Sequence, residues 1–138
     1  MAQPETVQTT DVILVKRYIL LPLILSAYER DQRIIKESGL FKTPDIYTEV
    51  LEIGLKAVTE ELRDIRKAFT KRGIKVYEEE KSKEGIRAEY LCRGYHQHIF
   101  LSWSLIKAEC VVMMRKYLGL DISRFKDPTT PEELQSEY

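Results

Sequence analysis

The segment of residues 73–118 constrains the fold more than any other part of the chain. Its first part, residues 74–92, alternates apolar and polar side chains around a charged centre. The charged centre favours helix by propensity, but Gly73, Gly85 and Gly94 bracket two β-branched runs and favour strands. The pattern therefore predicts a two-stranded antiparallel β-hairpin. Because two strands are marginal in water, other elements must cover this ribbon.

Apolar residues at intervals of three and four predict three long helices. The first follows a cap at Thr10 or Asp11 and ends at Ser38 and Gly39, and the third begins near Tyr95. The second covers residues 44–72: Thr43 caps it, Pro44 occupies its first turn and Gly73 ends it. The short link between the first two helices makes them antiparallel neighbours.

Pro22 leaves the form of the first helix open. Proline lacks the N–H that would bond to the carbonyl of Tyr18, and its ring crowds that carbonyl. Two structures satisfy this constraint. The helix is kinked at Pro22, or it begins only near Leu21 with residues 12–15 extended.

The predicted fold is mainly α, of the α+β class. A long antiparallel αα-hairpin, a two-stranded antiparallel β-hairpin and a third long helix packed on the first two make up one unit. We expect residues 1–10 to be a polar N-terminal tail and residues 11–125 a single helical domain. Residues 126–138 are expected to be a C-terminal tail or a short helix, because Thr130 and Glu133 match a capping box.

Charge and hydropathy limit the function classes. The formal net charge is +0, so the chain as a whole has no long-range field that would attract nucleic acid or anionic lipid. The uninterrupted apolar run of residues 18–28 is about half of the ~20 residues that a bilayer span needs. No signal-peptide pattern precedes Cys92 and Cys110, so we expect a cytoplasmic protein with reduced thiols and no membrane contact.

The residues that could carry chemistry are few. His96 and His98, with Cys92 just before them, are the only soft-ligand cluster, and on the expected helix the two imidazoles point apart. We therefore expect no metal, and a role at the helix start for the histidines. No glycine-rich phosphate loop and no nucleophile with an orienting base occur. The sequence predicts neither a cofactor nor an enzyme.

Basic residues cluster where the second helix meets the β-hairpin. A helix followed by a basic hairpin is the local order of a winged-helix DNA reader, although the helix is about twice the usual length and acids dilute the charge. Candidate nucleic-acid contacts are Arg63, Arg66, Lys67, Lys71, Arg72, Lys75 and Lys83, with Lys81 and Arg87 on the same hairpin. DNA binding is the second functional hypothesis.

The first and third helices carry more apolar surface than three helices and one ribbon can cover. This surplus predicts a homodimer, with parts of the first or third helix at its interface or with the hairpins paired into a four-stranded sheet. The leading hypothesis is thus a non-enzymatic interaction or regulatory module. A third is a small-molecule binder or enzyme whose pocket is lined by Tyr18, Tyr90, Trp103 and Tyr117.

Overall fold

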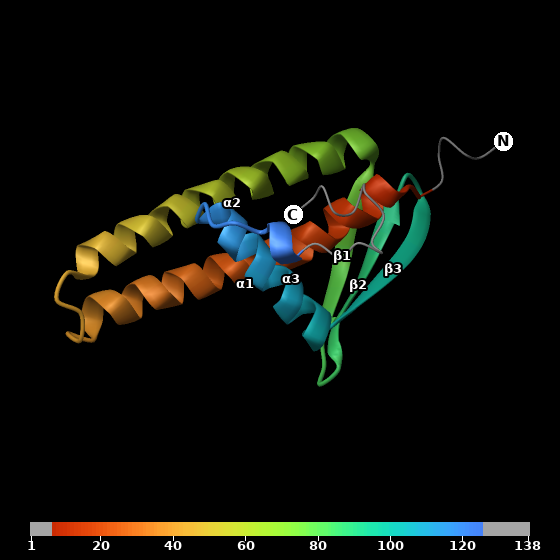
Figure 1. Ribbon diagram of the computed structural model, residues 1–138. Helices are drawn as coiled ribbons and strands as arrows, with labels where there is room; N and C mark the ends of the chain where they lie inside the picture. The colour runs from red at the N-terminus through yellow and green to blue at the C-terminus, as the bar shows by residue number, and fades with distance from the viewer. Residues whose placement is uncertain (1–6, 126–138) are drawn as a thin grey trace.

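A computed structural model describes residues 7–125 and gives an α+β fold (Figure 1). The elements in chain order are α1 (Thr9–Glu37), α2 (Pro44–Arg72), β1 (Ile74–Lys81), β2 (Gly85–Cys92), β3 (Tyr95–Ser102), α3 (Trp103–Tyr117) and the 3-10 helix η2 (Ser123–Phe125). The predicted αα-hairpin, the β-hairpin and the packing of a later helix on both α1 and α2 are confirmed. Residues 1–10 were expected to be a polar tail and residues 126–138 a tail or a short helix; residues 1–6 and 126–138 lie outside the described residues.

α1 and α2 form the predicted antiparallel hairpin, and the bounds of α2 are those expected. Gly73 ends α2 in the left-handed conformation at φ 69°, which suits a residue without a Cβ. α1 is one continuous helix that already begins at Thr9, and Pro22 lies inside it on an exposed side. The alternative in which the helix begins near Leu21 and residues 12–15 are extended is therefore wrong.

The sheet has three strands, in the order β1-β2-β3, where the sequence analysis expected two. The third strand lies where we expected the start of the last helix. In β3, Ile99 lies opposite Ala88 and Leu101 opposite Ile86, so these apolar side chains join the buried face of β2. The side chains of residues 95–102 thus alternate between the two faces of the sheet, although this segment is about as apolar as the helix that follows it.

α3 begins at Trp103 and not near Tyr95. The side chain of Ser102 accepts a hydrogen bond of 3.2 Å from the backbone N–H of Leu105, which is the N-cap arrangement that favours serine at this position. β3 and α3 are therefore joined directly at one capping residue.

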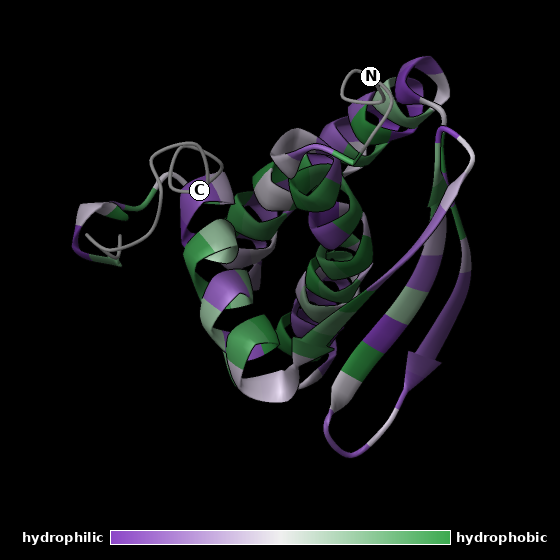
Figure 2. Ribbon diagram, turned by 90° about the vertical axis from the view of Figure 1, so that its right-hand side faces the viewer, coloured by the Kyte–Doolittle hydropathy of each residue, from purple (hydrophilic) through white to green (hydrophobic). Residues whose placement is uncertain are grey.

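The core collects side chains from the three helices and from one face of the sheet. α1 contributes Val15, Ile19, Leu21 and others to it, and Tyr90 and Ile86 contribute from β2. In Figure 2, hydrophobic and hydrophilic stretches alternate along the helices, as expected for helices with one buried and one exposed face. The far halves of α1 and α2 project beyond the sheet and α3 (Figure 1).

Candidate interaction surface

The projecting part of the αα-hairpin, residues 29–57, is called the hairpin end here, and it exposes large apolar side chains. Ile46 and Ile53 keep 59% and 62% of their surface in contact with solvent. The exposed apolar residues of the hairpin end are Ile34, Leu40, Phe41, Ile46, Tyr47, Val50 and Ile53. Single exposed apolar residues are ordinary on proteins, whereas a group of this size in one region marks a candidate binding surface.

One side of the hairpin end is an apolar cleft between the two helices. It is lined by Asp31, Ile34, Ile35, Phe41, Tyr47, Val50 and Leu51. The rings of Phe41 and Tyr47 pack at a centroid distance of 5.6 Å, which fixes the link between the helices against the start of α2. Two aromatic rings that pack against each other therefore line one side of the cleft.

A second apolar feature runs along the outer face of α2. Ile46, Val50, Ile53 and Ala57 follow one another at intervals of four, three and four, and we call them the outer stripe. Val50 is 43% exposed, while Leu55 and Val58 of the inner stripe are buried against α1. α2 is therefore apolar on two faces in its first half, and only one of them is covered within the described residues.

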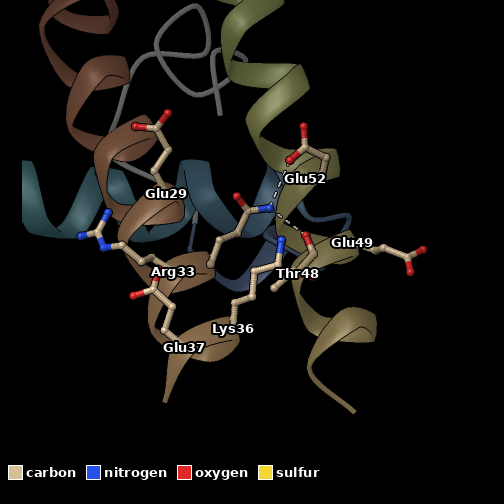
Figure 3. A pocket seen from close by; sticks show the side chains of 8 residues that line it. Glu29, Arg33, Lys36, Glu37, Thr48, Glu49 and Glu52 are labelled. Carbon is tan, nitrogen blue, oxygen red and sulfur yellow. Dashed lines mark hydrogen bonds between the residues drawn. The ribbon is translucent and has the colours of Figure 1, made fainter. Parts of the chain in front are cut away.

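A polar groove opens on another side of the hairpin end (Figure 3). Gln32 donates from its amide nitrogen to the carbonyl oxygen of Thr48 at 2.8 Å and to Glu52 at 3.1 Å. Acids and bases alternate around it: Glu29, Arg33, Lys36, Glu37 and Glu49. Gln32 therefore ties the two helices together where their apolar contact is thin, and the mixed charges define no single ligand.

At the opposite end of the hairpin, Asp11 forms a buried ionic cluster. Its carboxylate is fully buried and accepts hydrogen bonds from Arg93 at 2.7 Å and from Arg72 at 2.9 Å. Burial opposes the charge of Asp11, but hydrogen bonds from Arg93, the backbone N–H of Gln8, Arg72 and Cys92 outweigh it and lower its pKa to about 2. The cluster joins α1, α2 and the turn between β2 and β3.

Two further ionic contacts hold α3 against the hairpin. Tyr117 donates its hydroxyl hydrogen to Glu61 at 2.7 Å, and Arg17 forms an ion pair with the same carboxylate. Burial and the negative charge of Glu61 raise the pKa of Tyr117 well above its usual value. Lys16 pairs with the buried Glu109 at 2.7 Å. These charges fix where α3 docks.

The candidate metal ligands lie on two different faces of the sheet. His96 and His98 are exposed on the outer face of β3, on the same side because a strand alternates with period two. The expectation that they sit at a helix start and point apart is therefore wrong. Cys92 is fully buried on the inner face of β2. Among residues 7–125, no group of three or more His, Cys, Asp or Glu side chains could hold a metal ion.

His96 instead contacts a tyrosine across the sheet. The hydroxyl of Tyr77 lies 3.2 Å from Nδ1 of His96, and the rings meet edge to face at 6.0 Å. Cys110 is half-buried on α3, and burial raises the pKa of its thiol to about 11. Neither arrangement supplies an activated nucleophile.

The basic residues do not share one structural role. Arg63, Arg66, Lys67 and Lys71 are exposed on the second half of α2. Arg72 is instead engaged with Asp11 inside the ionic cluster. Lys75 is the second residue of β1, whereas Lys83 lies in the turn after the far end of that strand, about 25 Å away by the rise of an eight-residue strand.

The four aromatic pocket candidates occupy different surroundings. Tyr18 packs on Phe69 at a centroid distance of 5.0 Å, and Tyr90 is buried in the core. Trp103 is 38% exposed and donates from its indole nitrogen to the carbonyl of Ser82. Tyr117 belongs to the Glu61 ion pair. Packing and hydrogen bonds thus account for each ring.

Sequence reasoning missed the outer stripe. The apolar spacing of residues 44–72 predicted a helix, but Ile46, Val50 and Ile53 were not named as a group of their own. Their own spacing of four and three residues, offset from the Leu51 and Leu55 stripe, was the available signal.

The fold and surface define a small α+β protein in which a long helical hairpin projects from a three-stranded antiparallel sheet. The model of the YhjD protein family matches residues 7–122, and the chain therefore belongs to that family. The Uncharacterized protein YhjD of Bacillus subtilis (strain 168) is 28% identical over 85 residues, which span 62% of this chain and 70% of that protein. No solved structure matches the chain. Within residues 7–125, none of the helices combines the length and apolar composition that crossing a bilayer requires.

Proposed function

We propose that this protein is a non-enzymatic interaction module that acts as a homodimer in the cytoplasm. The observation that carries the proposal is the hairpin end, where Ile46 and Ile53 are more than half exposed on a helix that already buries its other apolar face. The homodimer was expected from the surplus of apolar surface on the first or third helix. The exposure of the hairpin end supports an interface on α2 instead.

Burial of the exposed isoleucines of the hairpin end would stabilise such a dimer. Fully burying an isoleucine side chain contributes about 1.5–3 kcal/mol, so completing the burial of one that is half exposed contributes on the order of 1 kcal/mol. A symmetric pair buries Ile46 and Ile53 of both copies, together with Val50. The sum is modest against the cost of association, so we expect a reversible dimer and not an obligate one.

The cysteines support the cytoplasmic part of the proposal. Cys92 and Cys110 are both free thiols, and one of them is buried in the core. Proteins of reducing compartments keep such thiols unpaired.

The test is the oligomeric state measured by size-exclusion chromatography with light scattering. The wild-type protein is expected to run as a dimer at micromolar concentration, and the double variant Ile46→Glu, Ile53→Glu as a folded monomer. Val111→Glu is the matched control, since Val111 is a 44% exposed apolar residue on α3. A wild-type protein that is monomeric throughout, or a dimer that Val111→Glu dissociates and the hairpin variant does not, would overturn the proposal.

Nucleic-acid binding is the second candidate. It rests on the exposure of Arg63, Arg66, Lys67 and Lys71 on one half of α2. Glu60 and Asp64 lie among them on the same helix and reduce the local potential, and Arg72 is engaged by Asp11. These features rank it behind the interaction module.

A further inference from the structure

We propose that the partner of the outer stripe is a second copy of α2, packed antiparallel across a two-fold axis that passes between Val50 and Ile53. This inference rests on the proposed homodimer and specifies its register. In this register Ile46 faces Ala57 of the second copy, and Val50 faces Ile53.

The first support is the spacing of the outer stripe. Intervals of four, three and four place Ile46, Val50, Ile53 and Ala57 on the alternating positions that form the seam of a two-helix coiled coil. A two-fold axis requires that residue i contacts j while j contacts i. With the axis midway between Val50 and Ile53, each residue of the outer stripe contacts a residue of the outer stripe of the second copy, and none of the four is left without a contact.

The second support is the charge beside the stripe. Glu49 and Lys56 are both exposed and lie seven residues apart, on the same flank of the outer stripe. A two-fold axis perpendicular to the helices brings this flank against the same flank of the second copy. In the proposed register, Glu49 of one copy and Lys56 of the other are offset by two residues along the helix axis. At a rise of 1.5 Å per residue this offset is about 3 Å, a distance that the two side chains can span. Symmetry forms the pair twice.

A parallel arrangement is less favourable for the same residues. In a parallel pair, the flank that carries Glu49 and Lys56 faces the opposite flank of the second copy, so Glu49 meets Gly54 and no contact between Glu49 and Lys56 forms. The antiparallel arrangement forms two of these attractive contacts. Charge thus selects the orientation, while the stripe supplies the contact.

Access to the outer stripe is consistent with this arrangement. The hairpin end projects beyond the sheet and α3, so a second helix can lie along the first half of α2 (Figure 1). Glu52, the neighbouring acid, accepts a hydrogen bond from Gln32 on the other side of α2, which leaves Glu49 as the acid beside the stripe.

Charge reversal tests the register. Glu49→Lys and Lys56→Glu are each expected to weaken the dimer about tenfold, because each single variant replaces two attractive exposed contacts by two repulsive ones. The double variant Glu49→Lys, Lys56→Glu is expected to restore the affinity to within about twofold. Lys75→Glu, an exposed change on β1, is the control and leaves the dimer unchanged.

The outcomes separate this inference from the proposed function. Recovery in the double variant supports the antiparallel register. A dimer that Ile46→Glu, Ile53→Glu dissociates but that does not respond to these reversals, or that the double variant weakens further, overturns the register and leaves the homodimer standing. A wild-type protein that is monomeric overturns both.

Discussion

The carboxylate of Asp11, in the first turn of α1, accepts a 2.7 Å hydrogen bond from the guanidinium of Arg93, 82 residues later in the chain. Arg93 lies in the turn between β2 and β3 with a positive φ of 50°, and it also donates to the carbonyl of Arg72 at 2.8 Å. One buried acid therefore closes the helical hairpin and anchors the sheet to it. These contacts offset the strain of the left-handed backbone conformation of Arg93.

We expect Asp11→Asn to destabilise the fold by about 2 to 3 kcal/mol. Removing one charge of a fully buried ion pair costs about 3–5 kcal/mol, and the cost is smaller here because Arg72 and Arg93 keep 35% and 22% of their side chains exposed. Urea denaturation measures the change. Asp64→Asn, an exposed acid on α2, is the control and is expected to stay within ~0.5 kcal/mol of wild type.

The same carboxylate predicts a loss of stability in acid. Its folded pKa of about 2 lies below the ordinary value of 3.8, so its stabilisation is complete above pH 3.8 and disappears as the pH falls toward 2. The shift corresponds to roughly 2 kcal/mol. The free energy of unfolding, measured from pH 5 to 2, should fall less steeply in Asp11→Asn, and equal slopes in the two proteins would contradict the assignment.

Gly85→Ala should disrupt the pairing of β2 with β3. A Cβ at this position would lie 2.0 Å from the carbonyl oxygen of Leu101 and 2.8 Å from Cα of Ser102, both backbone atoms that cannot rotate away. We expect a loss above about 3 kcal/mol, or failure to fold. In Gly39→Ala the added Cβ has no atom within 4 Å, so we expect only the loss of stability caused by a positive φ at alanine, about 1 kcal/mol. Similar thermal midpoints for both variants would refute the close approach.

Tyr117→Phe should loosen α3. The change removes the hydroxyl that donates to Glu61 and accepts from Arg17, and a hydrogen bond to a charged group contributes about 1.5–3 kcal/mol. Because other contacts of the Arg17 and Glu61 pair remain, we expect a loss near ~1.5 kcal/mol in chemical denaturation. Tyr95→Phe, at a 41% exposed tyrosine, provides the comparison and should be neutral.

The two functional hypotheses differ in whether the protein binds duplex DNA. We expect no shift of duplex DNA by the wild-type protein at physiological salt, because acids lie among the exposed bases of α2. A mobility-shift titration at low and high salt measures this. Binding that falls steeply with salt and is abolished by Arg66→Glu, Lys71→Glu would place the second candidate first.

The sequence by itself determined α2 and the presence of a helix before it, because these signals are local. Pro44 and Gly73 fix the ends of α2 through the backbone conformations that these residues favour, while Thr43 forms no side-chain cap hydrogen bond. Apolar residues every three or four positions fix the inner face of α2. The bracketing glycines likewise predicted β1 and β2. These signals require no knowledge of distant parts of the chain.

Only the tertiary structure decided β3, the ionic clusters and the outer stripe. Residues 95–102 are apolar enough for a helix and become a strand because the edge of β2 supplies hydrogen-bond partners. Arg72 resembles a surface base until Asp11, 61 residues earlier, is placed beside it. Ile46 and Ile53 resemble core residues until α1 is seen to cover the other face of α2. In each case the local spacing fits more than one structure, and a contact with another segment of the chain decides between them.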